Sequence, residues 1–69
     1  MKYNKLSDIP YLEEQAKLVG IYAALYTKFR RGDKISDEAR AALKDMNRIL
    51  INSGIESEAT KWVSENLED

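Results

Sequence analysis

The stretch Leu18-Val19-Gly20-Ile21-Tyr22-Ala23-Ala24-Leu25-Tyr26 decides the fold of this chain. Nearly all of its side chains are apolar, whereas an amphipathic helix of a small soluble protein keeps one face polar and in contact with water. The middle turns of this helix must therefore be covered by the rest of the chain, by a second copy or by another protein.

Placed at 100° per residue, the first helix carries two apolar stripes. The bulky stripe consists of Tyr11, Leu18, Tyr22, Leu25 and Phe29, and the opposite stripe of small residues consists of Ala16, Gly20, Ala23, Ala24 and Thr27. Because glycine inside a helix costs about 1 kcal/mol relative to alanine, the small stripe indicates close approach of another backbone. Two arrangements stay open. Both stripes are internal to a bundle with this helix at its centre, or one stripe is internal and the other binds a second copy or a target.

Capping and helix-breaking residues delimit the first helix. Ser7 or Asp8 can cap its start, and Pro10 is tolerated in a first turn. Gly32 is suited to the left-handed residue that follows a helix. These signals predict a helix over roughly residues 9–31, with residues 1–6 as a flexible N-terminal arm.

Two further helices follow. Ser36 caps a second helix that runs to about Asn52, where Ser53-Gly54 ends it, and Ser57 caps a third that runs to about Leu67. Their apolar residues fall on one face each: Ala39, Ala42, Leu43, Met46, Ile49 and Leu50 in the second helix, and Ala59, Trp62, Val63 and Leu67 in the third. We therefore expect an all-α fold in which residues 7–69 form one three-helix bundle, with a long first, medium second and short third helix, completed by dimerisation.

Size and composition limit the chemistry. A domain of 69 residues is marginally stable by itself, which also favours a homodimer. The chain has no cysteine and no histidine, so disulfides, thiolate chemistry and the commonest metal ligand are excluded. Since no catalytic motif or metal-ligand spacing appears either, we expect no enzyme, no metal site and no cofactor.

The net charge of −1 implies no general attraction to nucleic acid or membrane. Residues 1–34 hold seven Lys or Arg and four Asp or Glu, whereas residues 35–69 hold four and eight. The longest uncharged apolar run, residues 18–27, is about half of what a bilayer requires. We expect a cytoplasmic protein without a membrane segment.

These observations favour a non-enzymatic protein-interaction module: a regulator, adaptor or inhibitor that docks an apolar helix face with a charged rim onto a larger protein. The first helix supplies the expected interface residues of this module and of its homodimer, which are Gly20, Tyr22, Ala24, Tyr26 and Phe29.

A small nucleic-acid-binding regulator is the alternative. Its expected contacts, which also serve as the polar set for a protein partner, are Lys28, Arg30, Arg31, Lys34, Arg40, Lys44 and Arg48. Asn47 adjoins this basic set and can in principle read a base edge. Asp37 and Asp45 interrupt the basic surface, and the third helix is acidic, so this alternative is the less favoured one. A self-assembling structural subunit is the third hypothesis.

Overall fold

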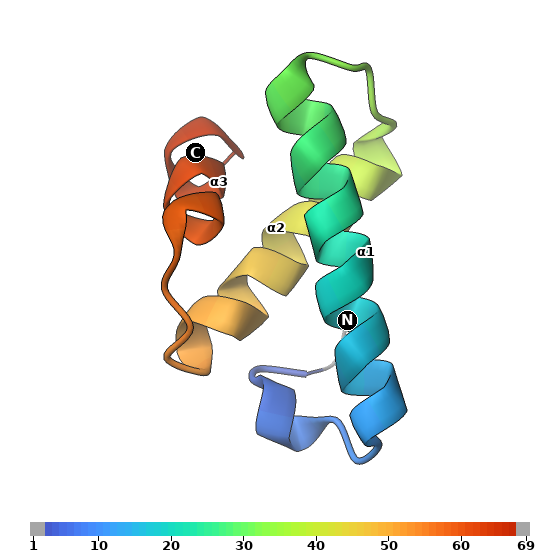
Figure 1. Cartoon of the computed structure of the whole chain (residues 1–69), viewed down its shortest axis with the longest axis vertical. Coiled ribbons are helices and arrows are strands. Elements are labelled where there is room, and N and C mark those ends of the chain that lie inside the picture. The colour runs from blue at the N-terminus through green and yellow to red at the C-terminus, as the bar shows by residue number, and fades with distance from the viewer. Residues whose placement is uncertain (1–2, 68–69) are drawn as a thin grey trace.

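The computed structural model describes residues 3–67, and in that range the fold is all-α with three α-helices and no strand (Figure 1). A short 3-10 helix, η1 (Leu6–Asp8), precedes α1 (Leu12–Arg31), α2 (Asp37–Asn52) and α3 (Glu58–Leu67). The predicted three-helix fold is therefore confirmed. Within residues 3–67, no helix combines the length and the apolar character needed to cross a bilayer.

The start of α1 differs from the sequence prediction, because the helix begins at Leu12 and not near residue 9. The Asp8 carboxylate accepts from the backbone N–H groups of Asn4 and Lys5, so it closes η1 instead of capping α1. Ile9 is extended, with φ −85° and ψ 116°, as expected for a residue that precedes a proline. Pro10 thus lies before α1 and not in its first turn.

The other helix ends follow the capping chemistry. The Ser36 hydroxyl accepts from the Ala39 N–H at the start of α2, and Ser57 and Thr60 exchange reciprocal bonds at the start of α3. Gly32 has φ 96° after α1, and Gly54 has φ 79° after α2. These glycines adopt the left-handed conformation that a Cβ atom disfavours.

The core lies between α2 and its two neighbours, since α2 packs against both α1 and α3 (Figure 1). Its buried apolar side chains are Ile9, Leu18, Tyr22, Leu43, Met46, Ile49, Leu50, Val63 and Leu67. The second helix, and not the first, is therefore the central element of the chain. As a result, α1 packs in the core along one face only.

The segment before α1 lies against the C-terminal end of α2. The Leu6 N–H donates to the Ser53 hydroxyl (2.8 Å), and the Asn52 side-chain amide donates to the Asn4 carbonyl (2.8 Å). Tyr3 and Leu6 pack on the core beside buried Ile9. Flexibility of the expected arm stays a prediction, but residues 3–6 have defined contacts, and residues 1 and 2 lie outside the described range.

Candidate interaction surface

The two stripes of α1 have different environments. Four residues of the bulky stripe face the core: Leu18 and Tyr22 are buried, and Leu25 and Phe29 are half-buried against the core cluster. The fifth, Tyr11, lies before the first residue of α1 and is 65% exposed, so its assignment to the packed stripe was wrong. The stripe of small residues is exposed along its whole length. Of the two arrangements left open above, the structure therefore has one stripe inside the chain and the other at the surface.

The exposed side of α1 forms a continuous apolar surface, which we call the outer face. It consists of Leu12, Ala16, Val19, Gly20, Ala23, Ala24 and Thr27. Leu12 is 80% exposed and Val19 44% exposed, so two large apolar side chains flank the small ones. The Thr27 hydroxyl donates to the Ala23 carbonyl (2.8 Å), which satisfies the one polar side chain of the outer face.

Gly20 lies in the middle of the outer face without an internal reason to be glycine. A Cβ atom built on Gly20 meets nothing within 4 Å, and its φ is not positive. Neither backbone geometry nor packing inside the chain therefore excludes alanine, although alanine stabilises a helix interior by about 1 kcal/mol. The glycine gives the outer face its flattest point.

The interface residues predicted on the first helix divide between the two faces. Gly20 and Ala24 lie on the outer face, whereas Tyr22, Tyr26 and Phe29 lie on the inner one. Tyr22 is only 4% exposed, so its side chain is packed inside the chain and presents no surface to a partner. Tyr26 and Phe29 are half-buried, and each has its ring edge-to-face with Trp62 of α3.

A buried polar chain joins the three helices. The Tyr22 hydroxyl donates to Asn47 Oδ1 (2.7 Å), and Asn47 Nδ2 donates to the Ser64 hydroxyl (3.0 Å). Asn47 is fully buried, so its side chain cannot read a base edge, the role that the nucleic-acid alternative left open for it. Burial, and to a smaller extent Tyr26, raises the pKa of Tyr22 to about 12.

Among the predicted basic contacts, Arg30 joins α1 to α3. Its guanidinium carbon lies 5.8 Å from the ring centres of both Tyr26 and Trp62, and Arg30 Nη1 lies 3.2 Å from Glu58 Oε1. Hydrogen bonds to the Tyr26 hydroxyl and the Glu58 carboxylate raise the pKa of Arg30. This arrangement gives Arg30 a packing role between the helices.

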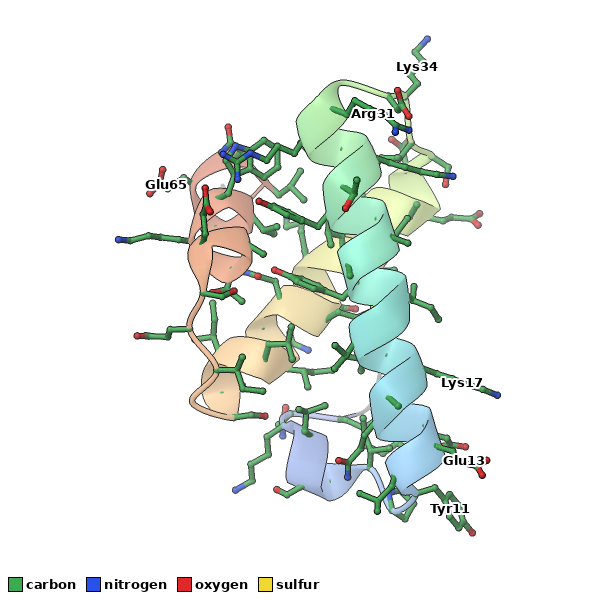
Figure 2. The ribbon with its side chains drawn as sticks, viewed as in Figure 1. Tyr11, Glu13, Lys17, Arg31, Lys34 and Glu65 are labelled. Carbon is green, nitrogen blue, oxygen red and sulfur yellow. The ribbon has the colours of Figure 1, made fainter. Side chains whose placement is uncertain are left out.

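Of the basic residues near the α1–α2 connection, Arg31 and Lys28 act on one carboxylate. Arg31 forms an ion pair with Asp33, and Arg31, with a smaller effect from Lys28, holds the pKa of Asp33 below its ordinary value. The same ion pair raises the pKa of Arg31. Lys34 projects from the connection into solvent (Figure 2).

The basic residues of α2 have different neighbours along the helix. The Arg40 guanidinium lies over the Phe29 ring at 5.1 Å from its centre, and Arg48 Nη2 lies 3.9 Å from Asp45 Oδ1. Lys44 between them is half-buried. The predicted basic residues therefore do not form one uninterrupted cationic surface, because acidic and aromatic groups lie among them.

A groove of about 670 Å³ runs between the end of α2 and α3. Ile51 contributes an apolar part of its lining, and the remaining residues are polar: Glu56, Ser57, Glu58, Thr60, Lys61, Ser64 and Glu65. The Thr60 hydroxyl is bonded to the Ser57 backbone, and the Ser64 hydroxyl accepts from Asn47. These hydroxyls are thus already engaged in holding α3 in place.

Sequence reasoning missed Asn47 and the contacts of residues 3–6. Helical spacing placed Asn47 beside the basic residues, whereas its burial is explained by its bonds to Tyr22 on α1 and Ser64 on α3. Comparison of the chain with protein-family models, curated proteins and solved structures found no match.

Proposed function

We propose that this chain is a non-enzymatic protein-interaction module, a small regulator, adaptor or inhibitor, and that it associates with protein through the outer face of α1. The observation that carries the proposal is the unbroken apolar surface of that face on a helix whose opposite side already fills the core. Contiguous apolar surface of this kind on a small protein is typical of protein–protein contact sites.

The shape of the outer face favours a helix as its partner. Small side chains at Ala16, Gly20 and Ala24 allow a second helix backbone to approach closely, which increases the van der Waals contact per residue. Leu12 and Val19 are large enough to act as apolar anchors beside them. The charged residues Glu13, Lys17 and Arg31 lie at the margins, where they can orient a partner.

We also propose that the module is a homodimer. A single copy leaves the outer face in water, and a domain of this size gains stability when association buries apolar surface. The cytoplasmic location expected from the sequence remains part of the proposal.

The test compares three immobilised proteins: the natural chain, Ala23→Glu and Ala41→Glu. Both alanines are exposed on helices, but only Ala23 is on the outer face. An extract of the source cells is passed over each protein, and the bound proteins are identified by mass spectrometry. We expect a set of proteins, including untagged copies of the chain itself, that the natural chain and Ala41→Glu retain and Ala23→Glu loses. Equal retention by all three proteins, or by none, would contradict the proposed role of the outer face.

A further inference from the structure

We propose that the outer face of α1 binds the outer face of α1 from a second copy, with the two helices antiparallel. The two-fold axis passes α1 between Ile21 and Tyr22, on the side of the helix opposite the core. This inference rests on the proposed function and names the partner of that surface. Three features of the outer face lead to it.

The first feature is the order of residues along the helix. In an antiparallel pair about this axis, Gly20 lies at the same level along the helix as the partner's Ala23, Val19 as Ala24, Ala16 as Thr27 and Leu12 as Arg31. Each of the first three pairs contains a glycine or an alanine, so no two bulky side chains meet at the same level beside the axis. The outer face can therefore approach a second copy of itself closely in a two-fold symmetric contact.

The second feature is the position of Gly20. The outer face is flattest at Gly20 and Ala23, immediately beside the axis, where two crossing helices come closest. A Cβ atom on Gly20 would meet nothing inside the chain, so packing within one copy does not explain why this residue is glycine. Close contact with the backbone of a second copy would explain it. The larger Leu12 lies at the end of the contact, where it can pack on the aliphatic part of the partner's Arg31.

The third feature is the charge at the two ends of α1. Glu13 lies in the first turn and Arg31 in the last, on the same side of the helix at 100° per residue. Antiparallel pairing brings Glu13 of each copy to Arg31 of the other, whereas parallel pairing places like charges together. Arg31 has 63% of its side chain exposed, so it can reach a second carboxylate while it remains beside Asp33. Figure 2 shows Glu13 projecting from the edge of α1 that is turned away from α3.

Disulfide trapping tests this arrangement, because the chain has no cysteine of its own. The variants Ala16→Cys and Thr27→Cys are oxidised separately and as an equal mixture, and covalent dimers are identified by mass. Antiparallel pairing places residue 16 opposite residue 27 of the other copy. Two copies of residue 16 are then displaced by eleven residues, or about 16 Å along the helix, which is beyond the reach of a disulfide. Ala41→Cys, exposed on α2, gives the background of random collisions.

We expect the mixture to form the 16–27 disulfide many-fold above the Ala41→Cys background, with little dimer from either variant alone. A strong dimer of Ala16→Cys alone would show parallel pairing and overturn the proposal. Covalent dimer no greater than background in every sample would also overturn it, provided that circular dichroism shows each variant to be helical. In that last case the proposed function can still hold, because loss of captured protein by Ala23→Glu is measured independently.

Discussion

At the scale of single residues, the bond between Tyr22 and Asn47 fixes α1 on α2. Tyr22→Phe keeps the ring but removes the donor that lies 2.7 Å from buried Asn47 Oδ1. An unsatisfied buried acceptor costs about 1–3 kcal/mol, so we expect the free energy of unfolding in urea to fall by that amount. Tyr11→Phe, at a residue that is 65% exposed, is the matched control and should change it little. Equal stability of the two variants would show that the buried bond contributes nothing.

The same tyrosine makes stability depend on alkaline pH. The pKa of Tyr22 is raised from 10.0 to about 12 in the folded chain, so between these values the unfolded chain has released a proton that the folded chain keeps. The contribution of Tyr22 is complete below pH 10 and is lost as the pH rises through 12. We expect urea unfolding measured across this interval to show a shallower decline for Tyr22→Phe than for the natural chain. An identical decline would argue against a raised pKa.

Glycines differ in what they do for the fold. Gly20→Ala should stabilise the folded chain at low concentration by about 0.5–1 kcal/mol, because the new methyl group meets nothing. Gly32→Ala should destabilise it by about 1–2 kcal/mol, since φ at Gly32 is 96°. Thermal unfolding of both variants measures the two effects. A destabilising Gly20→Ala at dilutions that favour the monomer would reveal an internal constraint that the structure lacks.

At the scale of helices, local chemistry made most ends predictable from sequence. The residues that end or begin these helices act through hydrogen bonds or backbone angles within a few residues of the chain. Their effect on the helix ends can therefore be inferred without knowing the fold, as at Gly32, Ser36, Gly54 and Ser57. The start of α1 was not predictable in this way, because the Asp8 carboxylate could either cap α1 or accept from N–H groups that precede it. In the structure it accepts from the Asn4 and Lys5 N–H groups and closes η1. The burial of Asn47 was not predictable either, since its partner Tyr22 lies 25 residues away in sequence.

The orientation of α1 shows a second limit of prediction. Periodicity identified its two apolar stripes but carries no information about which one meets the core, since both have helical spacing. In the structure, the side-chain volume decides which stripe is inside: the bulky side chains of Leu18 and Tyr22 pack in the core against α2, and the small side chains stay at the surface. Three of the five expected interface residues, Tyr22, Tyr26 and Phe29, consequently face inward.

The backbone of Leu6, in the segment before α1, is bonded to one side chain at the end of α2. The Ser53 hydroxyl accepts from the Leu6 N–H and donates to the Ile49 carbonyl. Ser53→Ala should therefore increase the hydrogen-exchange rate of the Leu6 amide, while amides in the middle of α2 keep theirs. Ser7→Ala, at an exposed residue of η1, is the control. An unchanged rate at Leu6 would indicate that apolar contacts of Leu6 and Ile9 alone hold the segment.

At the scale of the whole molecule, the arrangement of the helices separates stability from association. Because α2 contacts both neighbours and α3 is joined to α1 through Arg30 and Trp62, the chain has a complete core without using the outer face. Changes on the outer face should therefore alter association while leaving the helical fold intact. The association of the chain through α1 can therefore be measured without unfolding it.

That measurement is the solution mass of the natural chain and of Gly20→Leu, by light scattering after size exclusion, over a range of protein and salt concentrations. We predict a dimer of the natural chain that dissociates on dilution and persists in high salt, because apolar contact contributes most of its stability. Gly20→Leu should be a folded monomer under the same conditions, since leucine blocks the close approach of two helices. A natural chain that stays monomeric at every concentration, or a dimer that Gly20→Leu leaves unchanged, would contradict the account.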